Sequence, residues 1–509
     1  MSGLTVDDLR RQGQEKILEE QAALVNSGDD FILDCAKGGE SGDGRLFARL
    51  FKNRLVFDHA QGLWFRYVGP YWTSCEVNEP LQWIEKLIEI FSEAAKKEFF
   101  RKMNAIRTGK EKEAKQAENN EGIFLKKIGK LQRRQHRVNV LALAAAGEGS
   151  LGISGREWDA GKDFLIPCLN GVFDLAKGRF REGTPDDFVM KFAPVLWKGF
   201  DAKKSRWETF IFEILGEDLE KAQFLKRLLG SFIVGKVLDA VFPVFWGPGR
   251  NGKTILLEAL AYVLGPMAAP VQAELLMQQK FSRSAAAPSP EIMALRGLRL
   301  AWASESGEGR RLDSGRLKLL TGSDSLTGRG PYDRRMIAFK PTHSLVLLTN
   351  YRPAGNSQDR ALWARILSVR FPYSFVDNPL KENERQRDSN LLEELKAEGP
   401  GILSWLVDGF YAYREKGLAP PPSIQAETDE YRKSDDSIQH FITEKCAEGP
   451  ECSGRAQELF ESYEEFCSES GFKVKGKRAF FQRLQEQYIK EKDKNGKYYK
   501  GLCLKTPIV

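Results

Sequence analysis

One stretch of eight residues constrains the fold of this 509-residue chain more than any other. Residues 247–254 read Gly-Pro-Gly-Arg-Asn-Gly-Lys-Thr and match the complete pattern G-x-x-x-x-G-K-[ST]. The apolar run 241–246 before them has the residue types of a buried strand, and residues 254–264 after them show the apolar spacing of a helix. Strand, glycine-rich turn and helix in this order predict a phosphate-binding loop inside an α/β core.

Each residue type in this stretch suits the chemistry of a nucleoside triphosphate. Glycines let backbone N–H groups close around phosphates, and a helix N-terminus favours their negative charge. We expect Lys253 to reach the β and γ oxygens of ATP and the Thr254 hydroxyl to hold Mg²⁺. A chance Gly-rich turn is the alternative, and the flanking strand and helix disfavour it. The predicted ATP-binding residues are Gly247, Pro248, Gly249, Arg250, Asn251, Gly252, Lys253 and Thr254.

Two later apolar runs end in polar residues suited to phosphate hydrolysis. Residues 298–305 predict a strand that ends at Glu305, whose carboxylate would polarise water and support the metal. Residues 344–350 predict a second strand that ends at Asn350, whose amide would orient the attacking water. Glu305, Asn350 and Lys253 are therefore the predicted catalytic residues. The competing interpretation of Glu305 is a surface residue at a strand end.

Positive charge is concentrated in one segment of the chain. The net charge is +7, and residues 96–137 hold 14 Lys and Arg against 5 Glu. Such clustering is typical of a surface that follows a phosphate backbone, but it also occurs on a helical face that contacts only water. The charge pattern leaves both interpretations open.

Cysteine usage and hydropathy indicate a soluble protein of a reducing compartment. The seven cysteines include no C-x-x-C pair, which disfavours both a disulfide framework and a zinc module. The first residues show no secretory leader, and no apolar stretch reaches the roughly 18 residues that span a bilayer. No membrane partner is expected.

Three motifs after the loop carry a resemblance to a known family. Residues 316–329, 339–353 and 359–365 resemble consecutive motifs of superfamily 3 helicases, most closely the helicase portion of phage, plasmid and poxvirus primase-helicases. Residues 170–175 and the following Asp-Asp-Phe-Val at 186–189 resemble the region those proteins carry before the motor. The resemblance covers roughly residues 40–380.

The resemblance implies a multidomain α/β fold with an AAA+-like P-loop ATPase core. It also implies a ring, a hexamer, that translocates on single-stranded DNA in the 3′ to 5′ direction. Arg365 matches the family's arginine finger, which enters the neighbouring subunit's nucleotide site, but Arg352, Arg360 and Arg370 lie close enough in sequence to be alternatives. A β-hairpin within residues 318–340 would enter the channel of the ring. Its predicted DNA-binding residues are Arg329, Tyr332, Arg334, Arg335 and Lys340.

Composition shifts divide the chain into five predicted regions. They are an alpha-rich N-terminal collar or DNA-loading region (1–164), a pre-motor region (165–240), the ATPase core with flanking helices (241–414), a linker (415–437) and a winged-helix domain (438–509). Within the first region we expect helices over 5–26 and 80–105, a strand and turn over 63–72 and a mobile polar stretch over 106–122. Asn170-Gly171 predicts a hairpin. The winged domain would bind DNA through its Lys-rich third helix and hairpin, or a protein partner.

The function predicted from the sequence is an ATP-dependent replicative DNA helicase of phage, plasmid or mobile-element type. It would act on single-stranded and forked DNA in the cytoplasm of a bacterial or virus-infected cell. The residues before Leu165 carry neither a Cys–His cluster nor a paired-aspartate strand, so a separate primase is the expected partner. An origin-binding initiator ATPase that does not unwind DNA is the first alternative. A small-molecule P-loop kinase is the second.

Overall fold

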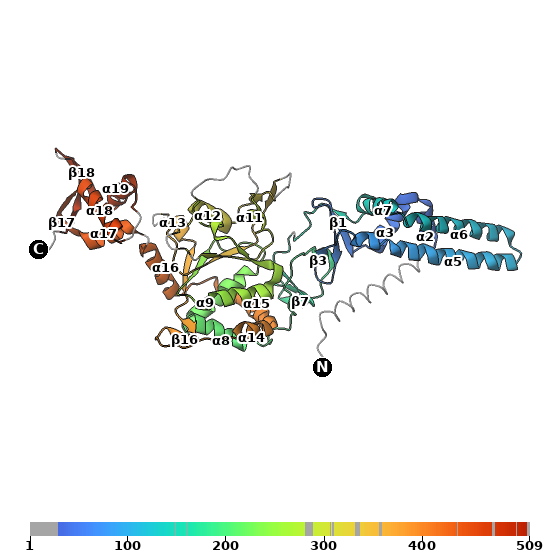
Figure 1. Cartoon of the computed structure of the whole chain (residues 1–509), viewed down its shortest axis with the longest axis horizontal. Coiled ribbons are helices and arrows are strands. Elements are labelled where there is room, and N and C mark those ends of the chain that lie inside the picture. Colours follow the sequence, from blue (N-terminus) through green and yellow to red (C-terminus); the bar gives the residue numbers. More distant parts are fainter. Residues whose placement is uncertain are drawn as a thin grey trace.

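The computed structural model describes residues 29–505 except 148, 160, 280–288, 306, 308–309, 331–335, 356–358, 435, 471–473 and 495. The described chain is elongated, with a helical hairpin at one end, an α/β unit in the middle and a small α/β unit at the other end (Figure 1). None of the described helices is both long and apolar enough to cross a membrane. The multidomain α/β class predicted from the sequence is confirmed.

The N-terminal region combines a helical cluster with a small sheet. Its helices are α2 (Asp29–Lys37), α3 (Gly39–Leu50), α4 (Glu79–Gln82), α5 (Glu85–Arg107), α6 (Glu111–Leu131) and α7 (Arg134–Ala146). The sheet has the order β3-β2-β1-β4, formed by β1 (Leu55–Asp58), β2 (Leu63–Tyr67), β3 (Trp72–Ser74) and β4 (Gly152–Ile153). The predicted helix over 80–105 and strand and turn over 63–72 are confirmed. The predicted helix over 5–26 lies outside the described residues.

The polar stretch 106–122 is not a loop, and the prediction of a mobile segment there is wrong. Most of it belongs to α6, which packs along α5 (Figure 1). Ala117, Phe124 and Leu131 are buried at seven-residue intervals, and Phe124 stacks on Phe91 of α5 with ring centroids 6.0 Å apart. A narrow apolar seam of this kind is enough to hold two helices together although the remaining positions are polar.

A three-stranded antiparallel sheet and two helices precede the central sheet. The strands β5 (Leu165–Cys168), β6 (Gly171–Asp174) and β7 (Arg179–Arg181) pair in chain order, and α8 (Ser205–Ile214) and α9 (Leu219–Phe232) follow. Cys168 pairs with Gly171, so the hairpin predicted at Asn170-Gly171 is confirmed. Gly171 has a φ of 153°, and a β-carbon on it would lie 2.5 Å from the carbonyl oxygen of Arg181. Only glycine fits this turn.

The central sheet has five parallel strands in the order β14-β8-β13-β10-β9. They are β8 (Phe242–Trp246), β9 (Ala268–Val271), β10 (Leu300–Glu305), β13 (Ser344–Thr349) and β14 (Ile366–Arg370). Every residue of β8 except the last is buried, which is the pattern of a strand covered on both faces. Connections between parallel strands need crossovers, and α10 (Lys253–Leu264) supplies the first.

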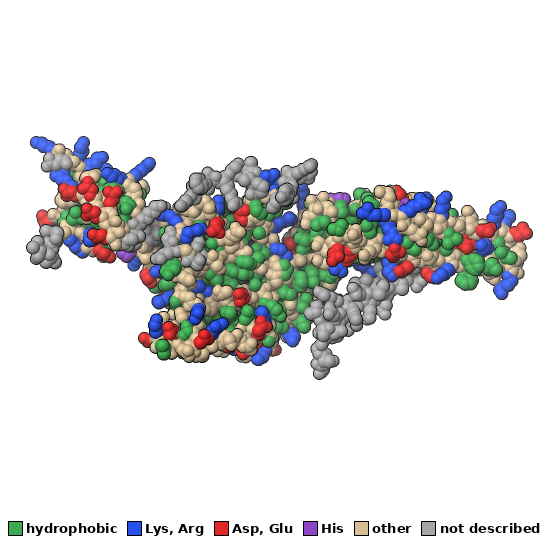
Figure 2. Space-filling view, viewed as in Figure 1, with side chains coloured by type: hydrophobic (Ala, Val, Ile, Leu, Met, Phe, Trp, Pro, Cys, Tyr) green, Lys and Arg blue, Asp and Glu red, His purple; other side chains and the backbone are tan. Residues whose placement is uncertain are grey.

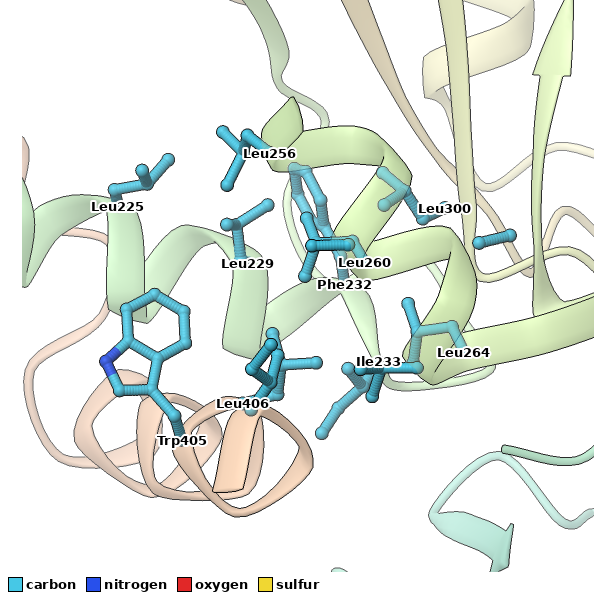
Figure 3. Packing of buried hydrophobic residues seen from close by; sticks show 14 of the residues in the cluster. Leu225, Leu229, Phe232, Ile233, Leu256, Leu260, Leu264, Leu300, Trp405 and Leu406 are labelled. Atoms are coloured by element: carbon cyan, nitrogen blue, oxygen red, sulfur yellow. The ribbon is translucent and has the colours of Figure 1, made fainter. Parts of the chain in front are cut away.

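The largest apolar core lies where α9, α10 and α15 (Gly399–Lys416) pack against one face of this sheet. Leu229, Leu260 and Leu406 come from the three helices and meet there, with Leu300 of the sheet beside them (Figure 3). Helices α9 and α15 touch at backbone level, because a β-carbon on Gly230 would lie 2.2 Å from the carbonyl carbon of Gly409. This packing fixes the helix that begins at the glycine-rich turn.

The remaining elements are short. They are α11 (Pro290–Met293), α12 (Ser314–Thr321), β11 (Leu326–Gly328), β12 (Ile337–Phe339), α13 (Arg360–Trp363), β15 (Ser374–Val376), β16 (Glu384–Gln386) and α14 (Leu391–Ala397), with 3₁₀ turns at Pro185–Asp187, Gly265–Met267 and Ala273–Leu275.

Most of the predicted linker is a packed helix. Helix α16 (Pro422–Ser434) lies along the edge strand β14, and Ile424 and Tyr431 are buried beneath it. The Thr428 hydroxyl accepts a hydrogen bond from the Ser368 amide at 3.0 Å, and the Glu427 carboxylate accepts one from the Arg370 amide at 3.0 Å. The helix therefore covers a strand edge that would otherwise expose its amides, so it does not behave as an exposed connector.

The C-terminal unit alternates helices and strands around its own core. Its elements are α17 (Ser437–Lys445), β17 (Cys446–Arg455), α18 (Ala456–Ser470), α19 (Lys477–Gln485), β18 (Ile489–Asp493) and β19 (Gly496–Leu504), with sheet order β17-β19-β18. Phe441, Phe460 and Phe480 are buried in the core. The three predicted helices and the C-terminal hairpin are present, whereas β17 was not predicted because its sequence holds few β-forming residues.

Candidate nucleotide-binding site

The glycine-rich motif forms the turn between β8 and α10. Gly247 has a φ of 146°, and a β-carbon there would lie 2.3 Å from the carbonyl oxygen of Phe371. Gly252 has a φ of 84°, and its β-carbon would lie 2.6 Å from the Ile214 side chain. Both positions therefore require glycine. The residues between them, Pro248 to Arg250, are exposed at the surface, as is Thr254 in the first turn of α10.

Lys253 lies across this turn instead of pointing into water. Only 6% of the residue is exposed, and its Nζ donates hydrogen bonds to the Gly247 carbonyl oxygen at 3.0 Å and to Asn350 Oδ1 at 3.4 Å. Burial lowers the pKa of this ammonium group to about 8. No carboxylate forms an ion pair with it among the described side chains. A phosphate at the turn would supply the opposite charge.

Strand register places the other predicted residues at the same edge of the sheet. Thr349, the last residue of β13, pairs with Trp246 of β8, so Asn350 lies level with the start of the turn. Glu305 pairs with Thr349 from the other side. Because the carboxyl ends of parallel strands meet at one edge, the backbones of these residues converge there. The side chain of Glu305 lies outside the described residues, so its role stays a prediction.

Residues 371–375, which the sequence analysis did not single out, hold the turn through hydrogen bonds. Asn251 is buried, and its side-chain amide donates to the Phe371 carbonyl oxygen at 3.4 Å. The Ser374 hydroxyl donates to the Gly249 carbonyl oxygen at 3.1 Å, and the Phe375 amide donates to the Arg250 carbonyl oxygen at 2.7 Å. The side chain of Asn251 therefore braces the loop, and its part in ATP binding stays a prediction.

The four candidate arginines fall into two groups at opposite ends of the sheet. Arg352 and Arg370 stack on Trp246 at 4.3 and 5.5 Å, beside the turn, and Arg352 also pairs with Glu430 of α16 at 3.2 Å. Arg365 lies before β14, where its carbonyl oxygen accepts from the Phe242 amide at 2.6 Å.

Phe242 is the first residue of β8, so the length of that strand, about 13 Å, separates Arg365 from the turn of its own chain. Its guanidinium donates to the Ala361 carbonyl oxygen at 2.8 Å. Exposed Arg360 lies on α13 at the same end. The preceding Asp359 pairs with Lys318 at 2.7 Å, and together with other hydrogen bonds this lysine holds the pKa of the Asp359 carboxyl below its usual value although partial burial acts in the other direction.

The predicted DNA-binding hairpin is present as a pair of strands. β11 and β12 are antiparallel, with Leu326 opposite Phe339 and Gly328 opposite Ile337. Three of the predicted contact residues, Tyr332, Arg334 and Arg335, lie outside the described residues. Arg329 is partly buried, and its amide donates to the Ser289 hydroxyl at 3.2 Å. Lys340 is exposed directly after β12.

The basic segment 96–137 is not a continuous cationic surface. Lys127 is buried and pairs with Asp43 at 2.7 Å, and Lys102 pairs with Glu121 at 2.7 Å between α5 and α6. Lys96 pairs with Glu93 at 2.7 Å on the surface of α5. Part of the positive charge therefore holds the helices together, which weakens the interpretation of this segment as one long phosphate-binding surface.

Comparisons with known proteins find similarity to putative viral helicases and primases over about half of the chain. Residues 44–216 match the family described as D5 N terminal like. Putative helicase L207/L206 of Acanthamoeba polyphaga mimivirus is 31% identical over 292 residues, which is 55% of this chain and 30% of that protein. Putative primase C962R of African swine fever virus is 26% identical over 244 residues, covering 46% of this chain and 25% of that protein. The chain is a primase-helicase-like protein. The resemblance noted from the sequence motifs is confirmed.

Other relatives of this primase-helicase-like chain show the same pattern. Putative helicase 022R of frog virus 3 is 24% identical over 270 residues, or 51% of this chain and 27% of that protein. The chain spans about a third or less of the length of these relatives. The solved C-terminal region of NrS-1 superposes with a TM-score of 0.48 at 11% identity, covering 89% of this chain and 96% of that structure. The matched family region includes residues 170–175 and 186–189, and it ends before the turn at Gly247.

Proposed function

We propose that this primase-helicase-like chain is an ATP-driven replicative DNA helicase. The observation that carries the proposal is the edge where β8, β10 and β13 end together. There the buried ammonium of Lys253 lies between the glycine-rich turn and Asn350, and β10 ends at Glu305 one strand further. A cation and an amide at a helix N-terminus, with a carboxylate on the neighbouring strand, form the set that phosphoryl transfer requires.

The residues at this edge fit a Mg²⁺-bound triphosphate. The turn offers backbone amides at the start of α10, and Gly249 has open space around it, so phosphate oxygens can approach the backbone. Thr254 is exposed beside the turn and would hold the metal through its hydroxyl, with Glu305 supporting it. The metal would neutralise charge on the phosphates, while Lys253 binds the β and γ oxygens and Asn350 orients water.

The position of Arg365 supports action between subunits. In its own chain this arginine lies at the far end of β8 from the turn, and Arg352 and Arg370 are already stacked on Trp246. A ring, a hexamer of AAA+-like cores, would bring Arg365 of one subunit to the Lys253 site of the next. A cation supplied in this way makes hydrolysis depend on assembly. Exposed Arg360 is the alternative finger from the same end of the core.

Single-stranded and forked DNA are the proposed substrates, with 3′ to 5′ movement. The β11–β12 hairpin would present Arg329, Tyr332, Arg334, Arg335 and Lys340 to the strand in the channel. We propose a second DNA contact through a winged helix at the C-terminus, and the order of helix, strand, two helices and hairpin in this unit supports it. Lys477 and Arg478 begin α19, and Lys490, Lys492 and Lys497 lie on the hairpin. A replication site in the cytoplasm of an infected or bacterial cell, with a separate primase, completes the proposal.

The basic residues at the start of α19 and on the C-terminal hairpin also favour a second candidate, an origin-binding initiator ATPase that does not unwind DNA processively. Such a protein would bind one duplex sequence tightly through α19 and the hairpin. Strand separation on a forked substrate distinguishes the two functions, since the initiator hydrolyses ATP without releasing the strand.

The test is strand release from forked DNA by wild-type protein and by Lys253→Ala. We expect ATP-dependent release by wild type and none by the variant, because the charge that holds the phosphates is lost. Lys198→Ala, which changes an exposed lysine away from the turn, is the matched control and should unwind normally. ATP turnover by Lys253→Ala at the wild-type rate would contradict the site assignment. Turnover without strand release by wild type would favour the initiator.

A further inference from the structure

The α5–α6 hairpin exposes apolar side chains that a soluble helix pair has no need to present. Phe99, Met103 and Ile106 of α5 are 42%, 50% and 59% exposed, and Leu125 of α6 is 55% exposed. Figure 2 shows hydrophobic and basic side chains together along this end of the molecule. Scattered exposed apolar residues are ordinary, whereas a contiguous group marks a contact surface.

These side chains share one face of the hairpin. Phe99, Met103 and Ile106 are spaced i, i+4, i+7, so they form one stripe along α5. Phe99, Met103 and Ile106 each come directly after a residue that faces the other helix. In the same way, Leu125 comes directly after buried Phe124. In an antiparallel pair of helices, the residue that directly follows an inward-facing residue points to the same side of the pair on both helices. The two helices therefore build one face.

On this face α6 carries glycines, which leave notches in its surface, whereas α5 carries large apolar side chains. Gly122 and Gly129 lie three residues before and four residues after Leu125, in the same stripe. A β-carbon added at either glycine would meet no atom within 4 Å. Glycine in the middle of a helix costs stability relative to alanine. Two of them beside an exposed leucine suit the close approach of another helix.

The charges on the two helices are complementary. Residues 96–107 of α5 hold five Lys and Arg against one Glu, and residues 111–122 of α6 hold four Glu against two Lys. Within one copy Lys102 already pairs with Glu121 at 2.7 Å. A twofold axis that runs parallel to the two helices, in the plane of contact, would lay α5 of one copy on α6 of another. The large apolar side chains of α5 would then lie against the glycines of α6, and basic residues would lie opposite acidic ones. The symmetry makes each of these contacts twice.

We propose that this open face binds the same face of a second copy of the chain across a twofold axis. The open face is defined as Phe99, Met103, Ile106, Gly122, Leu125 and Gly129. Such a contact is isologous, whereas the proposed ring uses head-to-tail contacts between subunits. The two interfaces are therefore different surfaces. In a ring-forming protein, the open face would pair copies that belong to separate rings.

The test is sedimentation velocity of the full chain without nucleotide at low ionic strength. It is repeated with Mg²⁺ and a nonhydrolysable ATP analogue, so that ring assembly, which would add larger species, is distinguished from hairpin pairing. We expect a monomer–dimer equilibrium, with at least a tenfold higher dissociation constant in the double variant Met103→Lys, Ile106→Lys. The control double variant Val77→Lys, Leu380→Lys places the same charges at sites 93% and 91% exposed and should associate as wild type does.

A second variant removes misfolding as an explanation. Gly122→Leu fills a notch with a residue of higher helix propensity, so the hairpin should remain folded while pairing weakens. A wild-type chain that stays monomeric throughout, or a Met103→Lys, Ile106→Lys chain that associates normally, would overturn the proposal. If the Met103→Lys, Ile106→Lys chain lost affinity for single-stranded DNA while its self-association stayed unchanged, the proposal would also be overturned. Nucleic acid would then be the occupant of the open face.

Discussion

At the residue scale, two opposing effects act on the charge of Lys253. Its burial between the turn and Asn350 disfavours a charge, and its pKa falls to about 8. Binding of phosphates requires that charge. The phosphates would raise the pKa again, so binding takes up a proton whenever the free protein has lost it. If Lys253 binds the phosphates as proposed, ATP affinity should be highest below pH 8 and should decline as the pH rises through that value.

We predict a decline of up to about tenfold in ATP affinity for each pH unit above 8, until the pKa of the complex is reached. Binding of a fluorescent ATP analogue between pH 6.5 and 10 measures it. Lys253→Arg keeps its charge throughout this range and should show no such decline, whatever its absolute affinity. An equal decline in both proteins would assign the proton to another group.

The sequence predicts the position of the turn between β8 and α10 because the pattern is local, while the roles of its residues stay predictions. The glycines, Lys253 and Thr254 lie within one motif, and Asn350 ends a recognisable strand. The braces of the turn were missed. Phe371 and Ser374 follow the motif by more than 100 residues and reach it only because β14 pairs with β8. No short-range pattern reports such a pairing.

At the scale of elements, sparse apolar residues caused the error in the N-terminal region. Residues 106–122 are polar on average, yet α6 forms around a few buried side chains seven residues apart. Composition hides such helices, whereas their spacing reveals them. Three strands of the central sheet, β8, β10 and β13, were predicted correctly because their apolar runs are continuous, whereas β9 and β14 were not predicted.

Helix α16 gives a prediction at this scale. A chain that ends at residue 437 keeps α16 and should retain basal ATPase activity, since every residue at the edge of the sheet keeps its contacts. A chain that ends at residue 421 loses the Glu427 and Thr428 hydrogen bonds to β14 and the burial of Ile424, the latter worth about 2 kcal/mol. We expect a lower melting temperature and weaker ATPase activity.

Thermal unfolding and phosphate release by the two truncated chains measure this difference. If both chains melt at the same temperature, α16 does not stabilise the sheet. If the longer one already loses ATPase activity while it stays folded, the C-terminal unit contributes to the nucleotide site.

At the scale of the whole molecule, the parallel sheet separates the two halves of the proposed reaction centre. Its carboxyl edge carries the turn, Lys253 and Asn350, and its opposite edge carries Arg365. A single chain cannot bring these together without unfolding β8. The central claim is that a neighbouring subunit supplies the missing cation, and it can be tested without knowledge of the subunit number.

The most direct measurement is ATP hydrolysis by mixtures of two inactive proteins. Lys253→Ala keeps its Arg365, and Arg365→Ala keeps its Lys253, so mixed rings contain some interfaces that pair an intact turn with an intact arginine. We predict that neither variant hydrolyses ATP alone and that the mixture does, with mixed assembly verified by native mass measurement. Mixed rings without activity, or wild-type turnover that stays proportional to protein concentration down to dilute monomers, would contradict the account.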